Sequence, residues 1–328
     1  VKQLLPLLTA IIILQVVFRF GFPYVWTDGV HYWQGIPKFW SFENQLDIAQ
    51  QISVNAILAF GMTLTILIGG IDLSVGAVVA LVGTVTVSVL ASGDPVSQSP
   101  LRLALAIAAG LGVAGVFGAF NGLCAACTRM PPFIITLATM RIARGVALRF
   151  NEARPIHVGE HESIFLALGN KRLFGEVPVP VVVMGVIFVV TAVVLHRTRF
   201  GQHLYAIGGN REAARYTGVP LIRRQAAVYV ICSLLAGVAG MIHASQLYSA
   251  EPASGEGFEL DAIAAAVVGG TSFTGGIGTM GGTLIGAVII GILNKGLNQA
   301  GVHFSLQYII QGLVILVAVY FDVRRRAK

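Results

Sequence analysis

Five charged side chains lie inside or beside long apolar runs of the chain. They are Asp72, Arg141, Arg144, Arg149 and Asp261. A charge at membrane depth costs several kcal/mol unless it is paired or hydrated, so each is by default a candidate functional residue. Two alternatives stay open. The aspartates could cap helix N-termini, and the arginines could extend their guanidinium groups to the membrane surface, which suits Arg149 better than Arg141.

Neutral polar side chains recur at a similar depth in the same runs. Hydroxyl and amide groups with few carboxylates suit a neutral polyol such as a sugar, although hydrogen bonding between helices is their commoner use. These side chains are Asn55, Thr63, Thr65, Ser74, Asn121, Thr136, Thr139, Gln246 and Asn294. The predicted translocation path comprises Asn55, Asp72, Ser74, Asn121, Phe133, Thr136, Thr139, Arg144 and Asp261.

Motifs of soluble enzymes occur only in unsuitable contexts. Residues 276–281 match GxGxxG but lack the strand and helix of a dinucleotide site, and the spacing of Cys124 and Cys127 has no second pair to complete a zinc set. His157 and His161 match the HxxEH order of zinc peptidases, in a stretch that reads as a loop. The dipeptide Gly-Lys is absent, so no P-loop is present and any ATP must be hydrolysed by another subunit.

These residues are placed by an unusually apolar chain. Of 328 residues 55% are hydrophobic and 11% are charged, which is typical of a membrane protein. The composition predicts an all-α polytopic fold and a single transmembrane domain over residues 1–328. Ten helices are expected near residues 4–20, 47–68, 74–92, 101–127, 133–149, 179–196, 226–248, 260–273, 282–299 and 307–322.

Basic residues between the runs predict the orientation. Residues 197–224 hold six arginines against the single acid Glu212, and the tail from Arg324 to Lys328 is also basic. Both should be cytoplasmic, as should the N-terminus if there are ten spans. The segment of about 150–178 is then an external loop, and the tryptophans Trp26, Trp33 and Trp40 lie in an outer aromatic belt. The same placement explains the net charge of +7 without nucleic acid.

Small residues predict close helix packing, at Gly118 with Gly122 and at Gly282 with Gly286. Two stretches are also weakly alike: Ile71-Asp72 precedes Ala77-Val-Val, and Leu260-Asp261 precedes Ala266-Val-Val at the same offset. In the predicted topology they begin helices of opposite direction, as in the inverted repeats of transporters. Chance similarity is an equal alternative.

Four longer motifs carry a resemblance to a known family. Val54-Asn-Ala-Ile-Leu-Ala-Phe-Gly-Met-Thr63, Gly69-Gly-Ile-Asp-Leu-Ser-Val-Gly76, Tyr205-Ala-Ile-Gly-Gly-Asn210 and Leu260-Asp-Ala-Ile-Ala-Ala-Ala-Val-Val-Gly-Gly-Thr271 resemble the ribose-type permeases of bacterial ABC importers. The resemblance covers residue 40 to the end. It implies a ten-helix inner-membrane subunit that imports a monosaccharide, works with a second permease copy or paralogue, and joins two cytoplasmic ATPases and a periplasmic sugar-binding protein.

The resemblance also implies that this chain holds no cofactor, with ATP and Mg²⁺ bound by the partner ATPase. Within a cytoplasmic segment of about 200–225, the residues expected to couple to that ATPase are Gly208, Asn210, Glu212, Ala213, Ala214 and Gly218. We expect residues 208–218 to form a short helix with Asn210 near its N-cap, Glu212 in its first turn, and a flat face at Ala213 and Ala214.

The chain departs from the ribose pattern in residues 22–39, at Pro131-Pro132 and at Arg141, which leaves the sugar open. We further expect Asn55, Asn121 and Thr136 to face the path, and Arg144 to have an internal partner. The alternatives are an ion-coupled secondary transporter, with Asp72 or Asp261 as its ion site, and a zinc enzyme built on His157 and His161.

Overall fold

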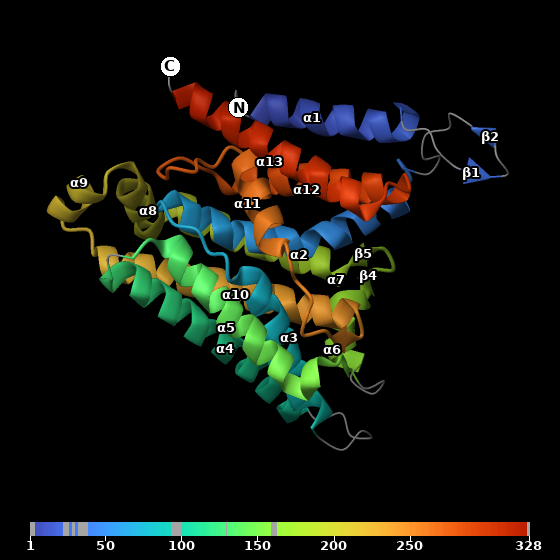
Figure 1. Cartoon of the computed structure of the whole chain (residues 1–328), viewed down its shortest axis with the longest axis horizontal. Helices are drawn as coiled ribbons and strands as arrows, with labels where there is room; N and C mark the ends of the chain where they lie inside the picture. The colour runs from blue at the N-terminus through green and yellow to red at the C-terminus, as the bar shows by residue number, and fades with distance from the viewer. Residues whose placement is uncertain are drawn as a thin grey trace.

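The computed structural model describes residues 4–21, 26–27, 30–31, 39–92, 100–128, 130–158 and 163–326. Most of them lie in helices that run side by side (Figure 1). The helices are α1 (Leu4–Val16), α2 (Phe42–Leu67), α3 (Val75–Ala91), α4 (Pro100–Cys127), α5 (Pro132–Arg149), α6 (Ser163–Asn170), α7 (Val179–Arg197), α8 (Arg199–Gly209), α9 (Arg211–Tyr216), α10 (Leu221–Gln246), α11 (Phe258–Val268), α12 (Met280–Gln299) and α13 (Phe304–Arg326).

Short strands and two other helical turns complete the described chain. A π-helical turn, η1 (Val17–Gly21), extends α1, and a 3₁₀ turn, η2 (Phe150–Ala153), follows α5. Three antiparallel pairs join β1 (Trp26–Thr27) to β2 (Val30–His31), β3 (Ile156–His157) to β6 (Ser249–Ala250), and β4 (Arg172–Leu173) to β5 (Val177–Pro178).

Each of the ten predicted apolar runs contains a helix, although the run at 260–273 is helical only to Val268. Within the described residues five helices are long and apolar enough to cross a membrane, namely α2, α4, α7, α10 and α12, and α1, α3 and α13 contain shorter apolar stretches. The helix α5 carries three arginines, and α11 has only 11 residues. At 1.5 Å per residue α11 spans roughly 16 Å, about half of a bilayer's hydrocarbon core.

Helix α10 lies at the centre and packs against α2, α3 and α4. A Cβ added at Gly118 of α4 would lie 2.7 Å from the Cα of Val230, and one at Gly122 would lie 2.7 Å from the Cα of Ala226. Gly286 of α12 touches the carbonyl of Ala265 in the same way. The small residues that predicted close packing therefore do bring α4 to α10 and α12 to α11.

Two helices begin in the interior, after non-helical chain. Residues 68–74 separate α2 from α3. Residues 247–257, which are irregular apart from β6, separate α10 from α11. The second residue of α3 meets the chain just ahead of α11, because a Cβ at Gly76 would clash with the carbonyl of Gly255 and with the carboxylate of Glu259. From that point α3 runs toward β3 and β6, whereas the chain that leaves α11 reaches Gly208 of α8 at Gly276. The predicted opposite directions of these two helices are confirmed.

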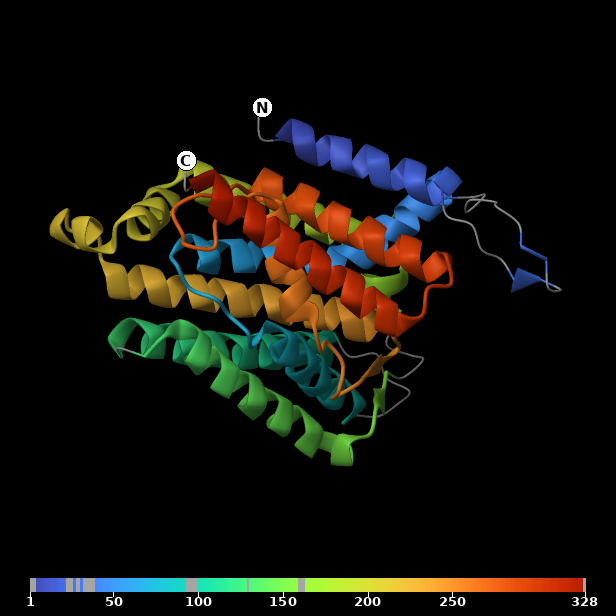
Figure 2. The ribbon, with the colours of Figure 1, turned by 45° about the horizontal axis from the view of Figure 1, so that its top comes forward.

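The described segments sort to two ends of the bundle. Strands β3 to β6 and α6 lie at one end, here named the strand end, and α8 and α9 lie at the other, the α8–α9 end; both termini are drawn toward the latter (Figures 1 and 2). This grouping agrees with the predicted loops. Of the belt tryptophans, Trp40 is half exposed and its indole donates to the carbonyl of Gln15, while Trp33 lies outside the described residues.

Candidate functional site

The chain between α2 and α3 is held by a closed polar cluster. Asp72 accepts hydrogen bonds from the backbone N–H (2.9 Å) and the hydroxyl (2.6 Å) of Ser74. Asn121 of α4 donates to the Ser74 hydroxyl at 2.9 Å, and Thr136 of α5 donates to the carbonyl of Ile71 at 3.2 Å. The side chains of Asp72, Ser74, Asn121 and Thr136 are fully buried. Asp72 therefore stabilises the turn that starts α3, as the capping interpretation requires.

Asp261 is placed differently. It is the fourth residue of α11, whose N-cap is Gly257, and within the described chain its carboxylate is hydrogen-bonded to the Asn55 amide of α2 at 3.4 Å and to no backbone N–H. Asp261 therefore does not cap α11 through a hydrogen bond to its backbone, although its place in the first turn suits the helix dipole, as the same interpretation expected. Asn55 and Asp261 both line a cavity of about 430 Å³.

The cavity beside Asp261 continues into a second one of about 580 Å³, with which it shares Gln51, Phe258, Asp261 and Asn294. We call the two together the amide cavity. It lies toward the strand end, between the first half of α2, the end of α12 and the beginning of α13. Its other polar linings are His243, Gln246, Glu256, Lys295, Asn298, Gln307, Tyr308 and Gln311.

Arg144 has the internal partners that its position predicted. Its guanidinium donates to the carbonyls of Pro252 (2.8 Å) and Ser254 (2.6 Å), which precede α11. The arginine thus attaches this non-helical chain to α5, next to the contact between Gly76 and Gly255. Arg141 and Arg149 are exposed on the same helix.

The nine predicted path residues consequently fall into separate places. Asp72, Ser74, Asn121 and Thr136 form the closed cluster, which Thr139 extends by donating to the carbonyl of Thr136 at 3.1 Å. Asn55 and Asp261 lie in the amide cavity, and Arg144 lies beside the start of α11. Phe133 is 49% exposed on the outer face of α5. Of these residues, only Asn55 and Asp261 border a cavity described here.

The predicted short helix of the coupling segment is α9. Asn210 is its N-cap and accepts the backbone N–H of Ala213 at 3.0 Å, with Glu212 in the first turn. The chain leaves the helix at Gly218, whose φ of +83° favours glycine. Gly208 belongs instead to the last turn of α8.

The expected flat face of α9 is only half correct. Ala214 is 3% exposed and packs into the chain's own core, so it cannot offer its side chain to a partner. Ala213 is exposed, and Tyr216 is 86% exposed. The free surface of α9 is therefore formed by Arg211, Glu212, Ala213, Arg215 and Tyr216.

Helix α8 packs directly against the chain that leaves α2 and against the chain that follows α11. Gly208 packs against the carbonyl of Leu67 at the end of α2, and Gly276 donates to that same carbonyl at 2.9 Å. The Tyr205 hydroxyl donates to the carbonyl of Gly278 at 2.7 Å, and burial raises the pKa of Tyr205, which keeps the hydroxyl protonated. The residues of the GxGxxG match thus serve this helix contact.

The zinc motif gains no support from the described residues. His157 lies exposed in β3, and His161 lies outside the described chain. Among the described residues, no group of three or more His, Cys, Asp and Glu side chains could hold a metal ion. The described cysteines Cys124, Cys127 and Cys232 are free thiols.

The sequence interpretation missed most of the amide cavity. Gln51, Asn298, Gln307 and Gln311 all line it, but none was selected. The available signal was spacing, since Gln51 precedes Asn55 by four residues, as Asn294 precedes Asn298 and Gln307 precedes Gln311. Residues four apart lie on one helix face.

Apolar helices, two of which start inside the bundle, and an exposed capped helix at one end define a multi-pass membrane permease. The chain belongs to the permease family described as branched-chain amino acid transport system / permease component, whose model matches residues 44–319, and within it to the ribose-type import permeases. Proteins of this family are transport subunits and not catalytic enzymes.

Three relatives illustrate the similarity. The chain is 44% identical to the ribose import permease of Escherichia coli K12 over 292 residues, which cover 88% of each chain. It is 44% identical to the ribose import permease of Bacillus subtilis 168, covering 89% of this chain and 88% of the relative. The D-allose permease protein of E. coli K12 is 37% identical over 87% of this chain and 84% of its own. No solved structure gives a significant match.

Proposed function

We propose that this chain is the membrane subunit of an ATP-driven importer that carries a monosaccharide across a bacterial inner membrane. The observation that carries the proposal is the 44% identity to ribose import permeases over 88% of both chains. Relatives named for D-allose and L-arabinose, at 37% and 35% identity, point to the same solute class. Amide and hydroxyl groups at membrane depth suit such a neutral polyol.

The proposed orientation places the α8–α9 end in the cytoplasm, with both termini. It is supported by the six arginines of residues 197–224 and by the basic tail. Two permease chains, either identical or paralogous, would then pair around the path. The partner ATPase would bind ATP and Mg²⁺ at the cytoplasmic face, and a sugar-binding protein would deliver solute at the strand end.

The contacts of α8 suggest how ATP-driven movement would reach the path. An ATPase that displaces α9 pulls on α8, and α8 touches both Leu67, ahead of α3, and Gly276, behind α11. The start of α3 at Gly76 meets Gly255 in the chain just ahead of α11, so a shift of either segment changes the contact between them. The path residues named above border these two helices or the chain that leads into them.

Reconstitution tests the proposal. Proteoliposomes that contain the permease, its ATPase and its binding protein should take up at least one of D-ribose, D-allose and L-arabinose when ATP is supplied inside, and should not take up a branched-chain amino acid. Uptake by the permease alone, driven by an ion gradient, would contradict the proposal and favour a secondary transporter.

A further inference from the structure

Three helices each present a pair of amide side chains to the amide cavity. The two members of each pair are four residues apart and therefore share a helix face. The pairs are Gln51 and Asn55 on α2, Asn294 and Asn298 on α12, and Gln307 and Gln311 on α13. Packing alone does not require this pattern, because an apolar side chain at any of these positions would pack in lipid or protein without hydrogen-bonding needs.

The amides are only partly satisfied by one another. Gln311 donates to the side-chain oxygen of Asn294 at 2.9 Å, and Gln307 donates to the carbonyl of Val302 at 2.7 Å. At the floor, the amide of Asn55 lies 3.4 Å from Asp261, while its Oδ1 is buried and has no hydrogen-bond partner among the described residues. A buried acceptor without a donor is costly, so the floor favours an occupant that supplies a hydroxyl.

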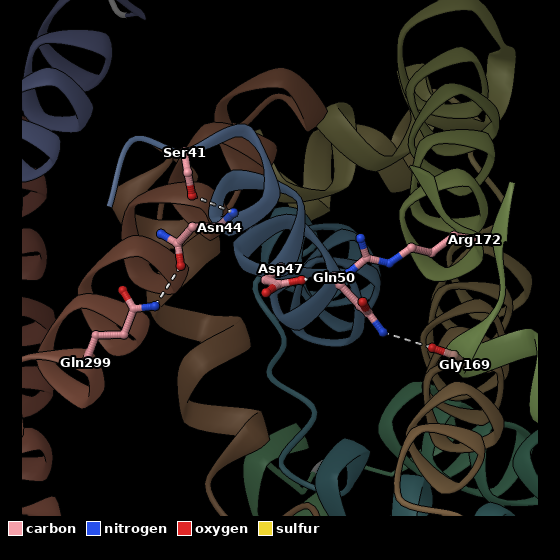
Figure 3. A network of polar contacts seen from close by, with 7 residues as sticks. All are labelled: Ser41, Asn44, Asp47, Gln50, Gly169, Arg172 and Gln299. Carbon is pink, nitrogen blue, oxygen red and sulfur yellow. Dashed lines mark hydrogen bonds and ion pairs between the residues drawn. The ribbon is translucent and has the colours of Figure 1, made fainter. Parts of the chain in front are cut away.

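The remaining lining is mostly aliphatic, with three aromatic side chains among it. Phe258, Phe304 and Tyr308 border the second cavity, together with Glu256 and Lys295. Close to the mouth, a polar network fixes the first turns of α2: Gln299 donates to Asn44 at 2.6 Å, and Arg172 reaches Asp47 at 3.1 Å (Figure 3). These two contacts hold the first turns of α2 to α12 and to β4.

We propose that the amide cavity is a low-affinity binding site for the transported monosaccharide within each copy of this chain. This inference rests on the proposed function and names where the solute is held. Amides both donate and accept, as sugar hydroxyls do, and the adjoining cavities of about 430 and 580 Å³ fall within the usual range of small-molecule sites. The closed cluster around Asp72 is fully buried and is not the resting place of the solute.

Thiol accessibility with sugar protection tests the inference. In a chain with Cys124, Cys127 and Cys232 changed to alanine, the reporter is Asn298→Cys and the matched control is Ile309→Cys, which is 57% exposed on α13. Membrane vesicles that carry the complete importer, with the strand end outward, are treated with a membrane-impermeant thiosulfonate. D-ribose, D-allose or L-arabinose is added at increasing concentration without ATP.

The reporter should react, and one of the sugars should slow that reaction by a factor of 1 + [L]/Kd, about threefold when its concentration is twice its dissociation constant. The control should react only with a lipid-soluble maleimide, at a rate that sugar does not change. A reporter that reacts at an unchanged rate at every sugar concentration, in vesicles that do take up sugar, overturns the inference. So does a reporter that only the lipid-soluble reagent reaches, since lipid then fills the cavity.

Transport by variants gives a second, separate measure. Asn294→Leu should reduce the rate of uptake at low sugar concentration by about threefold to tenfold, the equivalent of one neutral hydrogen bond, whereas Asn294→Gln should retain most of it. Equal uptake by both variants and the parent contradicts the inference. Absence of any ATP-driven sugar uptake by the parent would instead defeat the proposed function, whereas a failure of protection in vesicles that do take up sugar defeats only the location of the site.

Discussion

Two aspartates with similar neighbours have different surroundings in this permease. Asp72 lies three residues before the start of α3, whereas Asp261 lies three residues after the start of α11. A carboxylate ahead of a helix can reach the free N–H groups of its first turn, but one in the second half of that turn points outward. One oxygen of Asp72 is therefore held by the backbone and hydroxyl of Ser74, whereas Asp261 lies beside a cavity.

Arg144→Leu should destabilise the protein. The substitution leaves the carbonyls of Pro252 and Ser254 without their donor, which costs about 1–3 kcal/mol. The melting temperature in detergent should fall, while Arg149→Leu on the exposed part of the same helix should melt like the parent. Arg144→Lys should recover part of the loss, because an ammonium can still serve one carbonyl. Parent-like melting of Arg144→Leu would show that these bonds contribute little.

Asparagine-to-alanine changes should separate the closed cluster from the amide cavity. Asn121→Ala removes a 2.9 Å bond to a buried hydroxyl and should lower the melting temperature, at a cost of about 1–3 kcal/mol. Asn55→Ala breaks only a 3.4 Å contact beside a cavity, so it should leave melting nearly unchanged and slow sugar uptake. The reverse order of melting temperatures would contradict this assignment.

Among the elements, α9 shows what sequence can and cannot predict. Asn210, Glu212 and Gly218 identify a capped helix because they act through local backbone geometry. The two alanines that follow are equivalent in sequence, and only the packing of α9 on the rest of the chain distinguishes exposed Ala213 from buried Ala214.

Ala213→Arg should uncouple the importer without harming the permease. The new side chain projects from the free face of α9, so the chain should insert and melt normally while sugar-stimulated ATP hydrolysis in the reconstituted complex is lost. Ala214→Arg should instead lower the melting temperature, because a guanidinium would enter the core. Full stimulation in Ala213→Arg would exclude that face from ATPase docking.

At the scale of the molecule, the positions of the apolar helices and the close contacts of glycines follow from the sequence, because hydropathy and residue size act locally along the chain. Each apolar run contains a helix, and Gly118 and Gly286 make the contacts expected of them. The amide cavity was not predicted, since its seven amides come from four helices whose relative rotation is set by packing. The sequence predicted that Arg144 has an internal partner, but it did not identify the carbonyls of Pro252 and Ser254 as the two acceptors.

The proposed orientation can be checked with two exposed aromatic residues at opposite ends. Phe174 between β4 and β5 is 101% exposed, and Tyr216 of α9 is 86% exposed. In the chain without native cysteines, an impermeant thiol reagent added outside intact cells should modify Phe174→Cys and spare Tyr216→Cys until the membrane is opened. The opposite pattern would invert the topology and place the basic segments outside.

The 11 residues of α11 bear on the order in which the chain is built. A stretch of roughly 16 Å is too short to partition into a bilayer by itself, and the non-helical chain before it has polar backbone groups that lipid cannot satisfy. The groups that receive it, Arg144 and Gly76, are translated earlier. Biogenesis should therefore be vectorial, with residues 247–268 entering only a bundle in which α2 to α10 have already assembled.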